Sequence, residues 1–460
     1  MSAFYSDPAI RRRLAEYLGG DSLDTATAFY VTHSDGCLLQ RGELHPPADL
    51  AKLMDQELDI ARSLADRESL LFHLDIEYVN FDSPLMAYEN PGHAFAMQEP
   101  TVRVIEELLL GWGITPLHLI TGQGHHFIWR VDFGSKVARR LAWLDPDPDL
   151  SRSCHARAGS GVFSEISLEM QGTFAAMALV MEYLAHRIKW LAAPVSAVPV
   201  EITAVHVGPG AFARREMVSI DVSEYGDPLH TRMIRMPYTN YLKPWLTGLL
   251  PDAAFGDGLP RLRAIPIFEM DVYGAIACRE DEASVRELAL RACSKIPIQE
   301  EGTTRLLEEY LGSDLRRFHE EFYSVSLHVD APFTLPEDLP LCVSDLLEWP
   351  NDRLLKPAGI QLVTRMLLSF GWHPRHIAGL IRSRFANPAY GWGVDWKEYD
   401  PGMRADFYTR LFAGLWKTGV DELVDFNCVS TAEKGFCSGA NHLGCSLSAF
   451  KETLSKPASS

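Results

Sequence analysis

One short stretch, residues 71–79 (LFHLDIEYV), limits most strongly what this chain can fold into. It begins apolar and β-prone, and then places two carboxylates, Asp75 and Glu77, two residues apart. Successive side chains of a strand point to opposite faces, so both carboxylates project from one face of the expected strand. A divalent cation such as Mg²⁺ or Mn²⁺ would remove the repulsion between them. Taken alone, however, such a pair more often marks an edge strand with a polar solvent face, so the rest of the chain must decide.

The composition of the 460-residue chain is that of an ordinary soluble protein, with 47% apolar and 23% charged residues. No run approaches the ~18 apolar residues that a membrane span needs, so we expect a cytoplasmic protein without a membrane partner. The formal net charge of −18 argues against a protein that coats nucleic acid non-specifically. Residues 360–420, with eight Lys/Arg against four Asp/Glu, carry a net charge of +4 and are compatible with a local basic groove.

Two further stretches carry polar residues on expected strands. Residues 116–131 predict a strand, a tight turn containing Gly122 and Gly124, and a second strand that carries His126. The glycines allow a close backbone approach or a positive φ, whereas a histidine on a half-buried strand is more often structural than functional. Residues 217–223 predict another strand, in which Asp221 is a third candidate acid.

Three cations, Arg232, Arg235 and Lys243, follow Asp221 closely in the sequence. Cations beside an acid fit a site that holds metal and phosphate together. A solvated charged loop is the commoner fate of such a sequence, and this alternative stays open.

The remaining pattern predicts an α+β protein of two domains. Helices are expected over residues 48–64 and 99–110, through most of 135–200, and over 282–322. The proline-rich stretch 331–340 predicts a boundary between a catalytic domain, residues 1–330 with a helical insertion at about 135–200, and an all-α domain, residues 331–460.

The spacing of these motifs resembles the archaeo-eukaryotic primase superfamily. Asp75 and Glu77 match its h-D-x-D/E motif, His126 in TGQGHH matches s-x-H, and Asp221 matches h-D. Residues 235–243 are similar to the R-x-P-x-S-x-H-x-K stretch of the family, but Thr239 replaces the serine and Tyr241 the second histidine. The resemblance implies a primase-type core with an RRM-like mixed sheet and helical insertions.

A second resemblance concerns the cysteines. Cys342, Cys428, Cys437 and Cys445 are similar in placement to the iron–sulfur domain of the primase large subunit. Four cysteines fit a [4Fe–4S] cluster; zinc is not excluded, although it usually prefers closely spaced cysteine pairs. His442 is a possible substitute ligand.

The two resemblances together imply a DNA primase or primase-polymerase that synthesises primers on single-stranded DNA from NTPs or dNTPs, with a helicase or another replication protein as a possible partner. Asp75, Glu77 and Asp221 would hold two Mg²⁺ or Mn²⁺ ions, and the glycine turn (Gly122, Gly124), His126, Arg232, Arg235 and Lys243 would bind the nucleotide. A basic and aromatic stretch would grip the template, and it comprises Arg375, His376, Arg382, Arg384, Tyr390, Trp392, Trp396 and Tyr399.

Three alternatives remain open. The chain could be a polymerase that extends primers for repair or for a mobile element without starting them. It could be an inert primase-like subunit that only binds nucleic acid, although the intact acids argue against this. A metal-dependent phosphoesterase would use similar acids but gives no reason for the cysteines.

Overall fold

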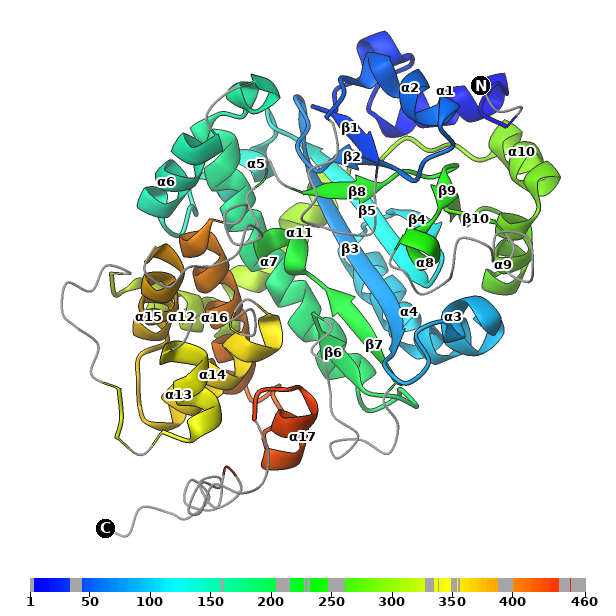
Figure 1. Ribbon diagram of the computed structural model, residues 1–460. Coiled ribbons are helices and arrows are strands. Elements are labelled where there is room, and N and C mark those ends of the chain that lie inside the picture. Colours follow the sequence, from blue (N-terminus) through cyan, green and yellow to red (C-terminus); the bar gives the residue numbers. More distant parts are fainter. Residues whose placement is uncertain are drawn as a thin grey trace. The chain divides into compact units, whose positions relative to one another are not determined.

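The computed structural model describes residues 4–33, 44–158, 161–203, 216–226, 229, 232–246, 261–326, 335–337, 339–348, 354, 356–387, 400–437 and 447. They form an α+β structure with a mixed sheet and many helices, which confirms the expected class (Figure 1). The chain divides into two compact units, the first Met1–Ile202 with Glu216–Glu309 and the second Thr203–Arg215 with Tyr310–Ser460. The expected boundary at residue 331 lies outside the described residues.

The first unit is built on a six-stranded sheet in the order β11-β4-β5-β3-β7-β6. Among its described pairings, β6 and β7 are parallel and the others are antiparallel. The strands are β3 (Ser69–Asn80), β4 (Leu117–Ile120), β5 (Gly124–Asp132), β6 (Val200–Ile202), β7 (Glu216–Asp221) and β11 (Ile265–Pro266). The expected acid-bearing strand, β3, therefore lies inside the sheet and not at its edge.

Alternation along β3 fixes which residues face the core. Leu70, Phe72, Leu74, Ile76 and Tyr78 are all buried on one face, while His73, Asp75 and Glu77 share the other. A slip of one residue in the pairing would turn both acids into the apolar core, so burial of the first face specifies the register.

Two smaller sheets also belong to the first unit. One pairs β1 (Val31–His33), β2 (Ile60–Ser63) and β8 (Met233–Arg235) in the order β1-β2-β8, and the other pairs β9 (Asn240–Tyr241) with β10 (Leu262–Arg263). In Figure 1, β8 crosses in front of β3.

The helix expected over residues 48–64 is wrong in its second half. Only η2 (Pro47–Asp49) and α2 (Leu50–Asp55) are helical there, and the chain then turns at Glu57, which has a φ of 54°. Residues 60–63 are strand β2, because they find hydrogen-bonding partners on both sides in β1 and β8. These partners lie far away in the sequence, so local periodicity could not show them.

Helices complete the first unit. They are α1 (Pro8–Tyr17), η1 (Leu23–Thr25), α3 (Met86–Glu89), α4 (Pro91–Trp112), α5 (Lys136–Ala142), α6 (Pro148–Ala158), η3 (Gly161–Glu165), α7 (Leu168–Ala192), η4 (Ser223–Gly226), α8 (Lys243–Leu246), α9 (Val272–Glu280), α10 (Glu282–Arg291) and α11 (Glu300–Leu311). The expected helix at 99–110 is the second half of α4, which begins at an Asn90 cap and ends at Gly113 in the left-handed region. Phe95 of α4 packs its ring against His125 on the apolar face of the sheet, with centroids 5.1 Å apart.

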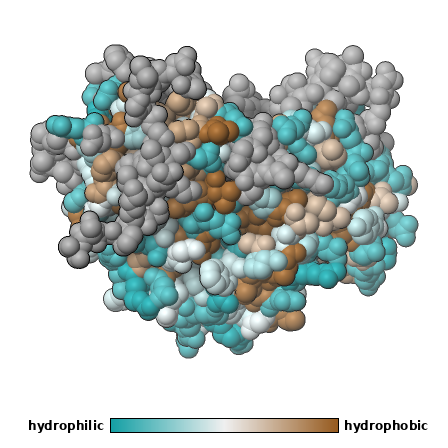
Figure 2. Space-filling model, turned by 90° about the horizontal axis from the view of Figure 1, so that it is seen from below, coloured by the Kyte–Doolittle hydropathy of each residue, from teal (hydrophilic) through white to brown (hydrophobic). Residues whose placement is uncertain are grey.

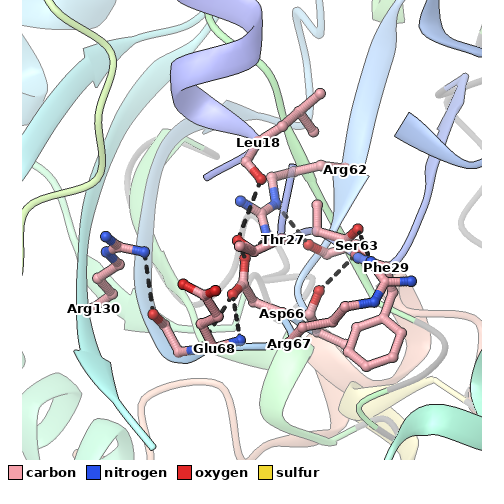
Figure 3. A network of polar contacts seen from close by, with 12 residues as sticks. Leu18, Thr27, Phe29, Arg62, Ser63, Asp66, Arg67, Glu68 and Arg130 are labelled. Carbon is pink, nitrogen blue, oxygen red and sulfur yellow. Dashed lines mark hydrogen bonds and ion pairs between the residues drawn. The ribbon is translucent and has the colours of Figure 1, made fainter. Parts of the chain in front are cut away.

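A buried polar network fixes the connection from β2 to β3 (Figure 3). Asp66 Oδ2 accepts hydrogen bonds from Arg62 Nη2 and from Thr27 Oγ1, both at 2.7 Å. Its Oδ1 accepts from the backbone N–H groups of Glu68 at 3.0 Å and Ser69 at 3.2 Å. Because Ser69 is the first residue of β3, this network sets the point at which the acid-bearing strand starts.

The second unit is helical in its described part. It contains α12 (Asp314–Tyr323), α13 (Leu341–Glu348), α14 (Pro357–Ser369), α15 (Pro374–Ala386), α16 (Pro401–Lys417) and α17 (Cys428–Glu433). Much of its positive charge is internal: Arg365 pairs with Asp421 and Asp425, and Arg375 pairs with Asp406. The excess of cations in residues 360–420 is therefore not simply a basic surface.

Along the described part of the chain, no helix has both the length and the apolar character needed to cross a membrane. Figure 2 shows, on the face that it presents, apolar side chains interspersed with polar ones. Mixed surfaces of this kind are usual for folded proteins and need no further explanation.

Candidate active site

Strand register brings together three residues that lie far apart in the sequence. On β3, Asp75 has Asp221 of β7 as its antiparallel partner on one side and His126 of β5 on the other. Directly opposed side chains share a face, with Cβ atoms about 4.5–5.5 Å apart. Glu77 lies two residues further along the same face of β3. The predicted acids and the predicted histidine therefore form one cluster.

This cluster opens into a cavity of about 210 Å³ within the first unit. The cavity is lined by seven of the predicted site residues, namely Asp75, Glu77, His126, Asp221, Arg232, Arg235 and Lys243. It is also lined by residues outside the predicted site, namely Ala61, His73, Thr121, Ser223, Glu224, Met233, Ile234 and Tyr241.

The two facing aspartates are only partly compensated by nearby cations. Burial raises the pKa of Asp75 and of Asp221, and for Asp221 the neighbouring Asp75 raises it further. The backbone N–H of Ser223 donates to Asp221 Oδ1 at 2.8 Å, whereas the buried Asp75 Oδ1 lies 3.3 Å from His126 Nε2 and makes no well-aligned hydrogen bond within the described structure. Two buried, facing carboxylates are a donor set that fits a hard divalent cation.

The third acid is already engaged. Lys243 Nζ donates to Glu77 at 3.1 Å; burial alone would lower the pKa of Lys243, but Glu77 outweighs this and raises it. Across the described residues, no three His, Cys, Asp or Glu side chains are grouped to hold a metal ion. The carboxylates of Asp75 and Asp221 are thus the donors that face each other, whereas Glu77 is paired with Lys243.

The two arginines differ in their surroundings. Arg235 is paired with Asp59, and its guanidinium lies 4.2 Å above the ring of Tyr241. Burial would lower the pKa of Arg235, but Asp59 raises it overall. Arg232 donates to Ser223 Oγ at 3.1 Å, beside the end of β7. Arg235 thus lines the cavity with part of its charge balanced by Asp59.

The glycine turn has a packing role. A Cβ on Gly124 would lie 1.8 Å from the carbonyl oxygen of Ile76, and one on Gly122 would lie 2.3 Å from the Tyr241 ring. These glycines permit close contact with β3 and with the ring that lines the cavity. Neither is itself among the described lining residues.

Two histidines lie side by side in the cavity wall. His126 Nε2 is 3.3 Å from Asp75 Oδ1, and burial together with His73 holds the pKa of His126 well below its ordinary value. The ring of His73 meets that of His126 edge to face, with centroids 4.7 Å apart. His73 Nδ1 contacts the carboxylate of Glu224 at 2.8 Å. Burial would lower the pKa of His73, but Glu224 raises it overall.

Strand alternation could have identified His73, which precedes Asp75 by two residues and therefore shares its face. Glu224 could not have been identified in this way, because it lies in the 3₁₀ turn η4 after β7. Its position depends on how that turn packs against β3.

The predicted cluster ligands are only partly described. Cys342 is buried in α13, Cys428 begins α17 and accepts a hydrogen bond from the backbone N–H of Leu447 at 3.1 Å, and Cys437 is half-buried. Cys445 and His442 lie outside the described residues. The three described cysteines do not form a metal-binding group. The aromatic residues predicted to grip a template, between 390 and 399, also lie outside the described part.

Comparison with models of protein families, with curated proteins and with solved structures gives no match.

Proposed function

We propose that this chain is a template-directed nucleotidyltransferase of the primase-polymerase type, which joins NTPs or dNTPs into a primer on single-stranded DNA. The reaction forms a bond between a 3′-oxygen and the α-phosphorus of a nucleotide and breaks the bond to pyrophosphate. The proposal is supported by the residues that the sequence motifs select, seven of which line one cavity in the first unit.

The cavity has the charge pattern that such a reaction needs. Its three predicted acids lie on the adjacent strands β3 and β7. Among its cations, Arg232 directly precedes β8, Arg235 ends β8, and Lys243 begins α8. Arg232 and Lys243 line the cavity and would attract the phosphates of a nucleotide, and His126 lies beside Asp75 in the same lining. Lys243 would exchange its contact with Glu77 for a contact with the ligand.

Asp75 and Asp221 would hold a divalent cation, with Glu77 as a further ligand. When bound, Mg²⁺ or Mn²⁺ supplies charge stabilisation for the phosphoryl group under attack. The protein contributes the rigid central strands that hold these carboxylates in register.

The test is a synthesis assay on single-stranded DNA with Mg²⁺ or Mn²⁺, run with and without a primer. Asp75→Asn and Asp221→Asn should each lower the rate at least about 100-fold, or roughly 2.7 kcal/mol of transition-state stabilisation. Thermal unfolding should stay near that of the native chain, because the substitution removes a buried negative charge.

Glu107→Gln, which alters an exposed acid on α4, is the matched control and should leave the rate unchanged. Full activity in Asp75→Asn would refute the assignment of the acids. Product formed only with a primer would favour a primer-extending polymerase, and nucleotide binding without any product would favour an inert subunit.

A further inference from the structure

We propose that His73 is a further residue that touches the bound nucleotide, through Nε2, and that Glu224 is the positioning residue that aims its ring. The inference deepens the proposed function and rests on it. No sequence motif pointed to either residue.

The ring of His73 is held firmly from one side. Its Nδ1 lies 2.9 and 2.8 Å from the two carboxylate oxygens of Glu224, and the side chain is only 3% exposed. Its backbone is held as well: the Tyr225 hydroxyl accepts from the His73 N–H at 3.0 Å and donates to the His73 carbonyl at 2.7 Å. The position and the tilt of the imidazole are therefore set before any ligand arrives.

The other ring nitrogen of His73, Nε2, is available to a ligand. His73 Nε2 is buried and has no hydrogen-bond partner in the described structure, although His73 lines the cavity. Nearby, His126 Nδ1 is also buried without a hydrogen-bond partner among the described residues, whereas Asp75 Oδ1 lies 3.3 Å from His126 Nε2. A buried polar atom without a partner is costly, and two such imidazole nitrogens, on residues that line one cavity, indicate that a polar ligand completes them.

The chemistry of the cavity limits which groups of a nucleotide His73 Nε2 could contact. Imidazole nitrogen can donate to a phosphate oxygen or accept from a hydroxyl group, and a nucleotide offers both. Arg232 and Lys243 line the same cavity and favour an anionic ligand. A phosphate oxygen and a sugar hydroxyl share this chemistry, and a binding experiment can separate them.

The experiment measures the affinity of the full chain for ATP, dATP and inorganic tripolyphosphate by calorimetry. His73→Phe keeps a ring but removes both nitrogens, and should weaken ATP binding about tenfold, the value of one hydrogen bond. His73→Gln places an amide near the position of Nε2 and should recover part of that affinity. Glu224→Gln should weaken binding less than His73→Phe does, because it weakens the contact that orients the His73 ring but keeps Nε2.

His125→Phe is the matched control, because His125 is a buried histidine on β5 whose side chain points to the opposite face from His126. It should leave all three affinities unchanged. An equal loss for tripolyphosphate and ATP assigns the contact to phosphate, and a loss for ATP that exceeds the loss for dATP assigns it to a sugar hydroxyl. Should His73→Phe fail to fold, His73→Asn, which lacks a group near Nε2, replaces it.

Unchanged affinity for all three ligands in the folded His73 variants overturns the inference alone, provided that Asp75→Asn still abolishes synthesis. Absence of nucleotide binding by the native chain overturns both the inference and the proposed function.

Discussion

Single residues in the cavity already carry partners in the absence of a ligand. Arg235 is held by Asp59, whose other oxygen accepts from the backbone N–H of Leu242 at 3.1 Å. Lys243 is held by Glu77. Each of these two cations is therefore balanced by an acid, whereas Asp75 and Asp221 face each other and the pKa of Asp221 is raised by burial and by Asp75.

A pair of buried histidines behind the site predicts sensitivity to acid. His118 Nε2 lies 2.9 Å from His125 Nδ1, and burial lowers the pKa of His118 to about 3 and that of His125 well below its ordinary value. Glu106, at 3.7 Å from His118, is 56% exposed and does not offset this burial. The folded state therefore binds fewer protons than the unfolded state below about pH 6.5.

Stability should accordingly be highest above about pH 6.5 and fall as the pH drops toward 3, by up to about 1.4 kcal/mol per pH unit for each histidine. His118→Phe keeps the stacking on Phe127, whose ring centroid lies 4.1 Å away, and should flatten that fall. Urea unfolding at a series of pH values measures the slope. An identical slope in the variant would show that other groups cause the loss.

Among the elements, the pairing of β3 with β5 is the contact on which the site depends most. It begins at Gly124, opposite Glu77, and continues to Asp132. Backbone of β3 approaches Gly124 so closely that no other residue fits without moving a strand.

Gly124→Ala should therefore destabilise the protein by at least about 3 kcal/mol, because its new Cβ meets backbone that cannot rotate away. Gly111→Ala in α4 is the control, since a Cβ there meets nothing within 4 Å. That control should stabilise the helix by roughly 0.5–1 kcal/mol. Denaturant unfolding of the two variants measures both effects, and equal stability would remove the packing argument for the turn.

For the whole molecule, the cysteine pattern predicts a metal cluster in the second unit. If the cysteine prediction holds, anaerobically purified protein contains about four irons per chain and absorbs broadly near ~400 nm. Cys428→Ser should abolish both signals, whereas Cys154→Ser, which alters a buried cysteine of the first unit, should not. Zinc in place of iron, or no metal, would contradict the predicted iron–sulfur cluster and the resemblance of residues 331–460 to the primase large subunit.

The sequence by itself determined the α+β class, the acid-bearing strand β3 and the shared face of Asp75 and Glu77, because alternation and strand propensity are local properties. It also pointed to the cations that line the cavity. That Asp221 lies opposite Asp75 is a strand pairing that only the tertiary structure shows. Only the tertiary structure decided that residues 60–63 are a strand, that Arg235 is paired with Asp59, and that Glu224 holds His73. Each of these depends on partners that are distant in sequence, and no local pattern encodes which partner a strand edge or a buried charge will meet.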